Sequence, residues 1–183
     1  MEYDRENVSF NVLRNALYHT ARRLTFDRWN RWASALVILL GAAAVADFFI
    51  RFGIETVYLS IAVTVVGTLQ LVFDFGGRAR DHQALQRDYY NLLAEMEEAP
   101  GTGDLAAFRA KMTRISGDEP PMMKALDAKA YNDAIDALEL NEDQRLVIPL
   151  GHRLMANLVS FNGSRYPKVC ELEAINSDAL KGG

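Results

Sequence analysis

The residues best suited to chemistry form a polar stripe within the most apolar stretch of the sequence. Hydroxyl side chains recur there every four residues, at Thr56, Ser60, Thr64 and Thr68, with Gly67 and Gln70 close to the last of them. On a helix of 3.6 residues per turn, steps of four drift by about 40° each and stay on one side. Small hydroxyl residues permit close helix packing and bond back to carbonyls one turn earlier. The alternative is that the stripe lines an aqueous path, which requires several copies of the chain.

Other reactive side chains lack the spacing that catalysis or metal binding needs. The histidines at 19, 82 and 152 fall on three separate predicted helices, without a cysteine or histidine at ligand spacing. We expect them to be surface or interface residues. Phosphate-binding glycine loops are missing, and acid pairs such as Asp133 and Asp136 suit solvated helix faces. The sequence therefore predicts no catalytic, cofactor-binding or metal-binding residues and no enzyme.

Composition limits the classes of partner. The 183 residues include 24 acidic and 20 basic side chains, for a net charge of -4, and no segment is basic enough to predict nucleic-acid binding. The single cysteine, Cys170, cannot form an intramolecular disulfide and suits a reducing cytoplasm. Residues 1–31 are amphipathic and charged, unlike a secretory signal peptide.

Two apolar stretches follow one another in the middle of the chain. Residues 32–50 contain one charged side chain, Asp47, near one end, and residues 56–73 contain none. Each is about as long as a helix that crosses roughly 30 Å of hydrocarbon. The five residues between them, 51–55, allow only a tight turn. The sequence thus predicts an all-α membrane protein whose residues 32–77 form a two-helix transmembrane hairpin.

The basic residues near the two spans predict the orientation of the hairpin. Four arginines precede the first span and three follow the second, whereas the turn has one: Arg22, Arg23, Arg28 and Arg31, then Arg78, Arg80 and Arg87, and Arg51 in the turn. The positive-inside rule places both termini in the cytoplasm. Trp29 and Trp32 suit the inner interface and Asp47 the outer one. Asp74 and Arg78 are spaced for an ion pair on one helix at the inner interface.

Amphipathic helices are predicted on both sides of the hairpin. Their apolar stripes are Phe10, Leu13, Leu17, Ala21 and Leu24 within residues 1–31, and Leu85, Tyr89, Leu92, Leu93 and Met96 within residues 78–98, which continue the second span. We expect the two stripes to pair below the membrane, unless the first helix lies flat on the bilayer surface. Candidate contacts in an oligomer are the small residues Gly41, Ala42, Ala43 and Ala44, with Leu13, Leu17, Tyr89 and Leu92.

Residues 99–163 predict a small C-terminal helical region. Asp104 is a candidate cap for a helix that carries Leu105 to Ile115, after the Pro and Gly of residues 99–104. A second helix runs through Met122 and Leu138, and a third through residues 146–158, with Pro149 at its start or at a kink. Residues 164–183 support no assignment and suggest partial disorder.

Short polar and aromatic motifs at the inner ends of the spans resemble those of a known family. The motifs are FDRWNRW at 26–32, LVFDFGGRARDH at 71–82 and QRDYYNLL at 86–93. With the two-span layout, they make residues 5–98 similar to the SLATT family of bacterial proteins associated with nucleotide-signalling defence systems. The resemblance implies a homo-oligomeric inner-membrane effector that forms a pore or disrupts the membrane during antiphage defence. It also implies a separate sensor, such as a nucleotide cyclase or a reverse transcriptase, as partner.

Two alternatives remain open at this level. The hairpin could anchor a cytoplasmic helical interaction domain, as in a scaffold protein, or the chain could be a holin-like lysis protein. An effector predicts loss of membrane potential that is sensitive to charge at Thr64 or Thr68, whereas an anchor predicts neither effect.

Overall fold

The computed structural model describes residues 2–99 and 104–181, and the side chains of residues 5–42, 45–99 and 104–175. The regular elements of these residues are all helical, and one isolated antiparallel bridge joins Leu146 to Lys168. The predicted all-α class is therefore confirmed. The chain divides into two compact units. We call residues 22–82 the hairpin unit, and residues 1–21 with 83–183 the helical module.

The sequence predicted one helix over the first apolar stretch, but the structure has two. Helix α1 (Glu2–Gly41) ends inside it, and α2 (Ala43–Arg51) begins after Ala42, whose backbone is extended at φ -76° and ψ 128°. The axes of residues 5–41 and 45–51 differ by 65°. Glycine has a low helix propensity, so the helix is weakened at Gly41, directly before the break. The expectation that residues 32–50 form one continuous helix was wrong.

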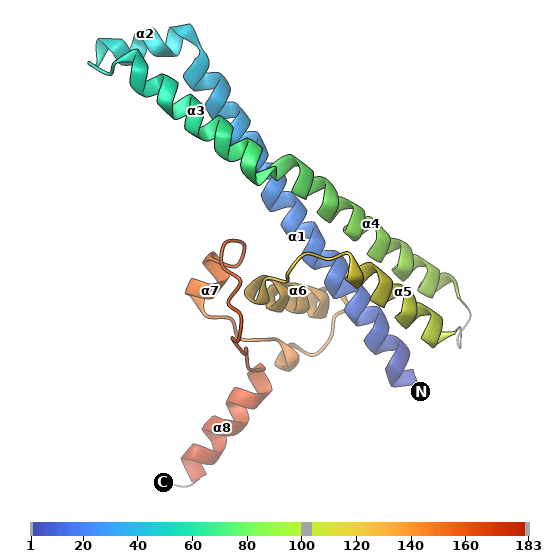
Figure 1. Ribbon diagram of the computed structural model, residues 1–183. Helices are drawn as coiled ribbons and strands as arrows, with labels where there is room; N and C mark the ends of the chain where they lie inside the picture. The colour runs from blue at the N-terminus through green and yellow to red at the C-terminus, as the bar shows by residue number, and fades with distance from the viewer. Residues whose placement is uncertain (1, 100–103, 182–183) are drawn as a thin grey trace. The chain divides into compact units, whose positions relative to one another are not determined.

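A short turn connects α2 to α3 (Thr56–Phe73) in the hairpin unit (Figure 1). Two amides close the end of α2, since Phe52 N–H donates to Phe49 O at 3.0 Å and Gly53 N–H donates to Ile50 O at 2.9 Å. Gly53 has φ 81°, in the left-handed region that glycine adopts without strain. The turn therefore depends on glycine at this position.

Asp74 separates α3 from α4 (Phe75–Glu98). Its backbone is left-handed, with φ 39° and ψ 57°, and its carboxylate oxygen Oδ1 accepts the N–H of Gly77 at 2.9 Å. A Cβ atom at Gly77 would lie 2.0 Å from Oδ2 of Asp74, so a larger residue there would displace the carboxylate that caps α4. The expected ion pair of Asp74 with Arg78 on one helix was wrong, because Asp74 lies outside the helix and caps α4. The Arg78 guanidinium instead lies over the ring of Phe26, 6.0 Å from its centroid.

In the helical module the first part of α1 packs against α4 and α5 (Leu105–Gly117). Their shared core is made of Val8, Val12, Ala16, Tyr89, Leu92, Met96 and Phe108. The predicted pairing of the two flanking helices is confirmed. The alternative of a first helix lying flat on a bilayer does not hold for residues 8–16, because protein covers them.

The face of α1 that pairs with α4 differs from the predicted one. Val8, Val12, Ala16 and His19 are buried, whereas Leu13 and Leu17 are only half-buried. A second core covers another side of α1 with α6 (Lys124–Ala137), and it consists of Tyr18, Ala125, Leu126, Ala130 and Ala156, against which Leu17 and Ala21 pack. Because α1 is covered on two sides, a single apolar stripe does not describe it.

The C-terminal region is partly as predicted. Asp104 caps α5, accepting the N–H groups of Ala106 and Ala107 at 3.1 and 3.2 Å. The prediction of a long third helix over residues 146–158 was wrong. A 3-10 turn (Glu142–Gln144) precedes this range, which holds the bridge at Leu146 and the short α7 (Leu150–Leu154). Pro149 stands directly before α7, where its fixed φ favours a helix start. Residues 169–181 of the unassigned tail form α8 (Val169–Lys181).

Candidate functional site

The hairpin unit exposes an apolar surface on α3. A stretch of 18 residues within the helix that includes α3 is long and apolar enough to cross a membrane, yet only 6% of its residues are buried. The bent pair of α1 and α2 passes the same test if it counts as one span. The exposed large apolar residues of this unit include Ile38, Leu39, Phe48, Phe52, Val57, Ile61, Val65, Leu69, Leu71 and Val72.

The predicted polar stripe lies on the exposed side of α3. Thr56, Ser60, Thr64 and Thr68 are all exposed, and Gly67 is half-buried. Two hydroxyls bond back to carbonyls one turn earlier, Ser60 to Thr56 O at 3.1 Å and Thr64 to Ser60 O at 2.8 Å. The stripe is therefore not covered by its own hairpin, and these two hydroxyls need no further partner in an apolar environment.

Gln70 does not belong to the stripe with which it was grouped. Its side-chain amide donates to Asn30 Oδ1 at 3.0 Å and to Ser34 Oγ at 2.8 Å, both on α1. Gln70 follows Thr68 by two residues, or about 200° around the helix, which turns it to the side that bears the buried Leu59. It therefore joins α3 to α1 inside the hairpin unit.

An aromatic cluster lies beside the break at Asp74. The buried Phe26 ring stacks on His82 at a centroid distance of 5.6 Å, and the Arg22 guanidinium lies 4.4 Å from the centroid of Phe26. Trp29 contacts Phe26 and Phe75 edge to face at 5.8 and 5.6 Å. The expectation that His82 is a surface or interface residue was wrong. The aromatic motifs at 26–32 and 71–82 could have predicted that His82 is buried, because the cluster joins one motif to the other.

All the remaining interface candidates except Trp29 are exposed. Trp32 has 66% of its surface exposed, whereas Trp29 is half-buried in the aromatic cluster. Asp47, Asp74 and Arg78 are also exposed. Trp32 and Asp47 are therefore available to meet a polar interface, whereas Asp74 caps α4 and Arg78 lies over Phe26.

A buried polar network lies in the helical module, and sequence reasoning missed it. His19 is fully buried, stacks on Tyr89 at 5.7 Å and places Nε2 3.3 Å from a carboxylate oxygen of Glu119. The Tyr89 hydroxyl donates to Glu119 and lies 2.9 Å from Ser116 Oγ. Burial, with help from Glu119, raises the pKa of Tyr89 well above its usual value near 10, so the phenol stays protonated. The expected surface role of His19 was wrong.

A second polar contact holds α6 on α1. Arg14 Nε donates to Asp127 Oδ1 at 2.8 Å, and a second guanidinium N–H donates to the other carboxylate oxygen. Asp127 is buried, so this bidentate pair supplies the partner that a buried carboxylate needs. The third histidine, His152, is half-buried and stacks on Phe161 at 3.9 Å.

Two of the predicted oligomer contacts are unavailable to a second copy. Tyr89 and Leu92 are buried in the core of the helical module. Leu13, Leu17 and Ala42 are half-buried and Gly41 is exposed, whereas the side chains of Ala43 and Ala44 lie outside the described ones. A contact between copies would therefore use a surface other than that of Tyr89 and Leu92.

Among the described residues, no group of three or more His, Cys, Asp or Glu side chains is placed to hold a metal ion. The hairpin unit offers an uncovered apolar helix with a hydroxyl stripe, and the helical module holds a buried polar network. No protein-family model matches the chain, and no curated protein or solved structure matches it either.

Proposed function

We propose that the chain is a homo-oligomeric protein of the bacterial inner membrane that makes the membrane permeable. Its hairpin unit crosses the bilayer twice, with both termini in the cytoplasm. In this proposal it acts in antiphage defence with a separate nucleotide-signalling sensor, such as a nucleotide cyclase or a reverse transcriptase. The observation that carries the proposal is the apolar stretch of α3, of which only 6% is buried.

The exposure of α3 argues against a water-soluble hairpin. Large apolar side chains such as Ile61, Val65 and Leu69 are exposed along it, and each buried methylene stabilises by about 0.8 kcal/mol when it leaves water. A soluble domain of this size would cover such a helix, whereas hydrocarbon covers it without protein. Lipid is therefore the partner of suitable chemistry and thickness.

The break at Ala42 is compatible with a span. Unpaired backbone groups are costly in hydrocarbon, so irregular backbone there needs internal partners. Ala42 N–H donates to Leu39 O at 3.3 Å, and Ala42 O accepts from Val45 and Ala46 at 3.0 and 3.1 Å. These bonds give both backbone groups of Ala42 a partner within the chain.

The hydroxyl stripe supports assembly of several copies. Thr56, Ser60, Thr64 and Thr68 are exposed on the hairpin, and one hairpin cannot enclose water. In an oligomer the stripe would face either a neighbouring hairpin or an aqueous path. Helix α3 has no charged side chain, so a path lined by it would select weakly between cations and anions.

The defence role draws on the resemblance of residues 5–98 to the SLATT family. The motifs at 26–32 and 71–82 that carry the resemblance meet in one aromatic cluster, which includes Phe26, Phe75 and His82. In an assembly, this packed cluster would hold the inner ends of the two spans together in the same way in each copy. The sensor would act on the helical module, whose α1 and α4 continue into the hairpin unit.

Thiol accessibility in proteoliposomes tests the proposal. In a Cys170→Ser background, Thr64→Cys places a thiol on the stripe, and Val65→Cys places one about 100° around α3. We expect a water-soluble thiol reagent to modify Thr64→Cys and change ion efflux, and to leave Val65→Cys unmodified. Equal reactivity of the two thiols, or vesicles that stay ion-tight with the protein inserted, would favour the anchor or scaffold function.

A further inference from the structure

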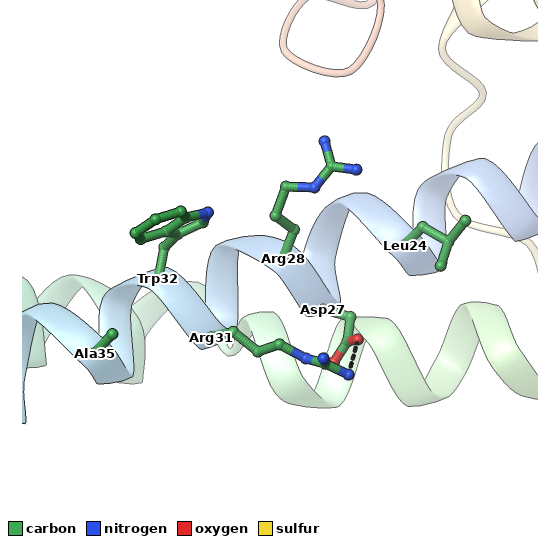
Figure 2. A pocket seen from close by; sticks show the side chains of 6 residues that line it. All are labelled: Leu24, Asp27, Arg28, Arg31, Trp32 and Ala35. Carbon is green, nitrogen blue, oxygen red and sulfur yellow. Dashed lines mark ion pairs between the residues drawn. The ribbon is translucent and has the colours of Figure 1, made fainter.

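One face of α1 in the hairpin unit carries a shallow hollow of about 510 Å³ (Figure 2). The residues that line it recur at helical spacing along that face: Leu24, Asp27, Arg28, Arg31, Trp32 and Ala35. Two arginines and an indole thus share one hollow with apolar side chains at both ends. None of these residues belongs to the hydroxyl stripe or to the aromatic cluster.

The hollow has a positive charge available for a ligand. Arg31 forms an ion pair with Asp27 at 2.8 Å, one turn apart, drawn as the dashed line in Figure 2. Arg28 is exposed and has no ion pair or hydrogen bond with another described residue. Its guanidinium retains its donors, whose planar geometry matches the oxygens of a phosphate group. The three charged side chains sum to one positive charge.

The order of residues along the hollow matches the layers of a bilayer leaflet. Arg28 and Ala35 are seven residues apart, which is about 10 Å along a helix. Headgroup regions are several ångströms thick, and indole rings prefer that level. Trp32 lies between the two residues and has 66% of its surface exposed. Beyond Ala35, the exposed Leu36 and Leu39 continue the apolar surface.

We infer that this hollow binds the phosphate headgroup of an anionic phospholipid of the inner leaflet. The phosphate takes the donors of Arg28, and the indole of Trp32, which points to the same side of α1 in Figure 2, lies along the glycerol and ester groups. The acyl chains follow the apolar surface from Ala35 toward Leu39. The inference rests on the proposed membrane topology and adds a lipid selectivity to it.

The fluorescence of Trp32 measures which lipid contacts the hollow. The chain has two tryptophans, so Trp29→Phe leaves Trp32 as the single indole. The full-length variant is reconstituted into phosphatidylcholine vesicles containing small amounts of brominated phosphatidylglycerol or brominated phosphatidylcholine, whose bromines quench indole fluorescence on contact. We expect half-maximal quenching at an about fivefold lower fraction of phosphatidylglycerol, the factor that one interfacial arginine contributes.

Charge-matched variants separate a site from general attraction to a charged surface. Arg28→Gln removes the arginine of the hollow, and Arg23→Gln removes an equal charge about 140° around α1. The preference for phosphatidylglycerol should disappear in Arg28→Gln and persist in Arg23→Gln. Equal losses in both variants would overturn the inference. Relief of quenching by inorganic phosphate in solution would also overturn it, because the site would then take a soluble anion.

The same experiment distinguishes failure of the inference from failure of the proposed function. If both brominated lipids quench Trp32 equally, the protein is inserted and only the lipid selectivity is wrong. If neither lipid quenches Trp32, the hairpin does not insert and the proposed topology falls with it.

Discussion

The helical module and the hairpin unit differ in how far their apolar side chains are covered by protein. In the module, Val12, Leu92, Met96 and Leu126 are enclosed by neighbouring helices, and its buried polar side chains, such as Asp127, have protein partners. In the hairpin unit, most apolar side chains of α3 are exposed, Thr64 bonds to its own helix and Gln70 bonds to α1. The module therefore covers its apolar side chains with its own helices, whereas the described residues leave most of the apolar surface of α3 uncovered.

The largest expected effect comes from one substitution made in both regions. Leu92→Ala removes a side chain with 2% of its surface exposed, and Leu71→Ala removes one with 82% exposed. A buried leucine loses both its transfer energy and its packing, so Leu92→Ala should lower the free energy of unfolding by about 3 kcal/mol. Leu71→Ala should change it by less than about 0.5 kcal/mol. Unfolding of the detergent-solubilised protein, followed by circular dichroism, measures both. Similar losses would contradict the division into two differently packed units.

A charge in the middle of α3 should affect insertion by a comparable amount. Val65→Asp places an acid near the centre of the apolar stretch, where insertion costs about 3 kcal/mol. Val147→Asp makes the same change at an exposed residue of the helical module, where the cost should be near zero. Alkaline extraction of membranes measures the inserted fraction of each variant. If Val65→Asp stays fully inserted, α3 is not a span.

Tyr89→Phe should have an intermediate effect on the module. It removes the hydroxyl that donates to Glu119 and contacts Ser116, at a cost of about 2 kcal/mol for a buried bond to a charged group. Because the pKa of Tyr89 is raised in the folded state, its contribution is complete below pH 10 and declines as the pH rises further. Denaturant titrations should therefore show that the difference in free energy of unfolding between the wild type and Tyr89→Phe shrinks from neutral to alkaline pH. A difference between the two proteins that grows with pH would refute this assignment.

The smallest effect is expected inside the hairpin unit. Gln70→Leu removes the bonds to Asn30 and Ser34, and such interhelical bonds contribute about 0.6 kcal/mol in membrane proteins. Thr68→Val changes an exposed neighbour and should leave the stability of the hairpin unchanged. Unfolding in mixed micelles with increasing dodecyl sulfate compares the two variants. An equal response would mean that Gln70 does not hold α3 to α1.

Periodicity predicted the helices better than it predicted their faces. The predicted stripe of α1 included Leu13 and Leu17, which are half-buried, because a helix covered on two sides has no single apolar face. Gln70 was grouped with Thr68 by proximity in the sequence, although the helix turns the two residues to different sides. The long third helix of the C-terminal region failed because Asn132 bonds both backbone groups of Leu146, at 2.7 and 2.8 Å, and holds it outside a helix.

The sequence by itself determined the helical class, the two apolar stretches, the tight turn at residues 51–55 and the cap at Asp104. These features depend on local propensity and on the length of an apolar run, which neighbouring residues specify. Only the tertiary structure decided which polar residues are buried. His19, His82 and Asp127 are buried because partners distant in the sequence, Glu119, Phe26 and Arg14, lie against them. The cost of burying a polar or charged group is met by such specific contacts, and no local pattern encodes where the partner will be.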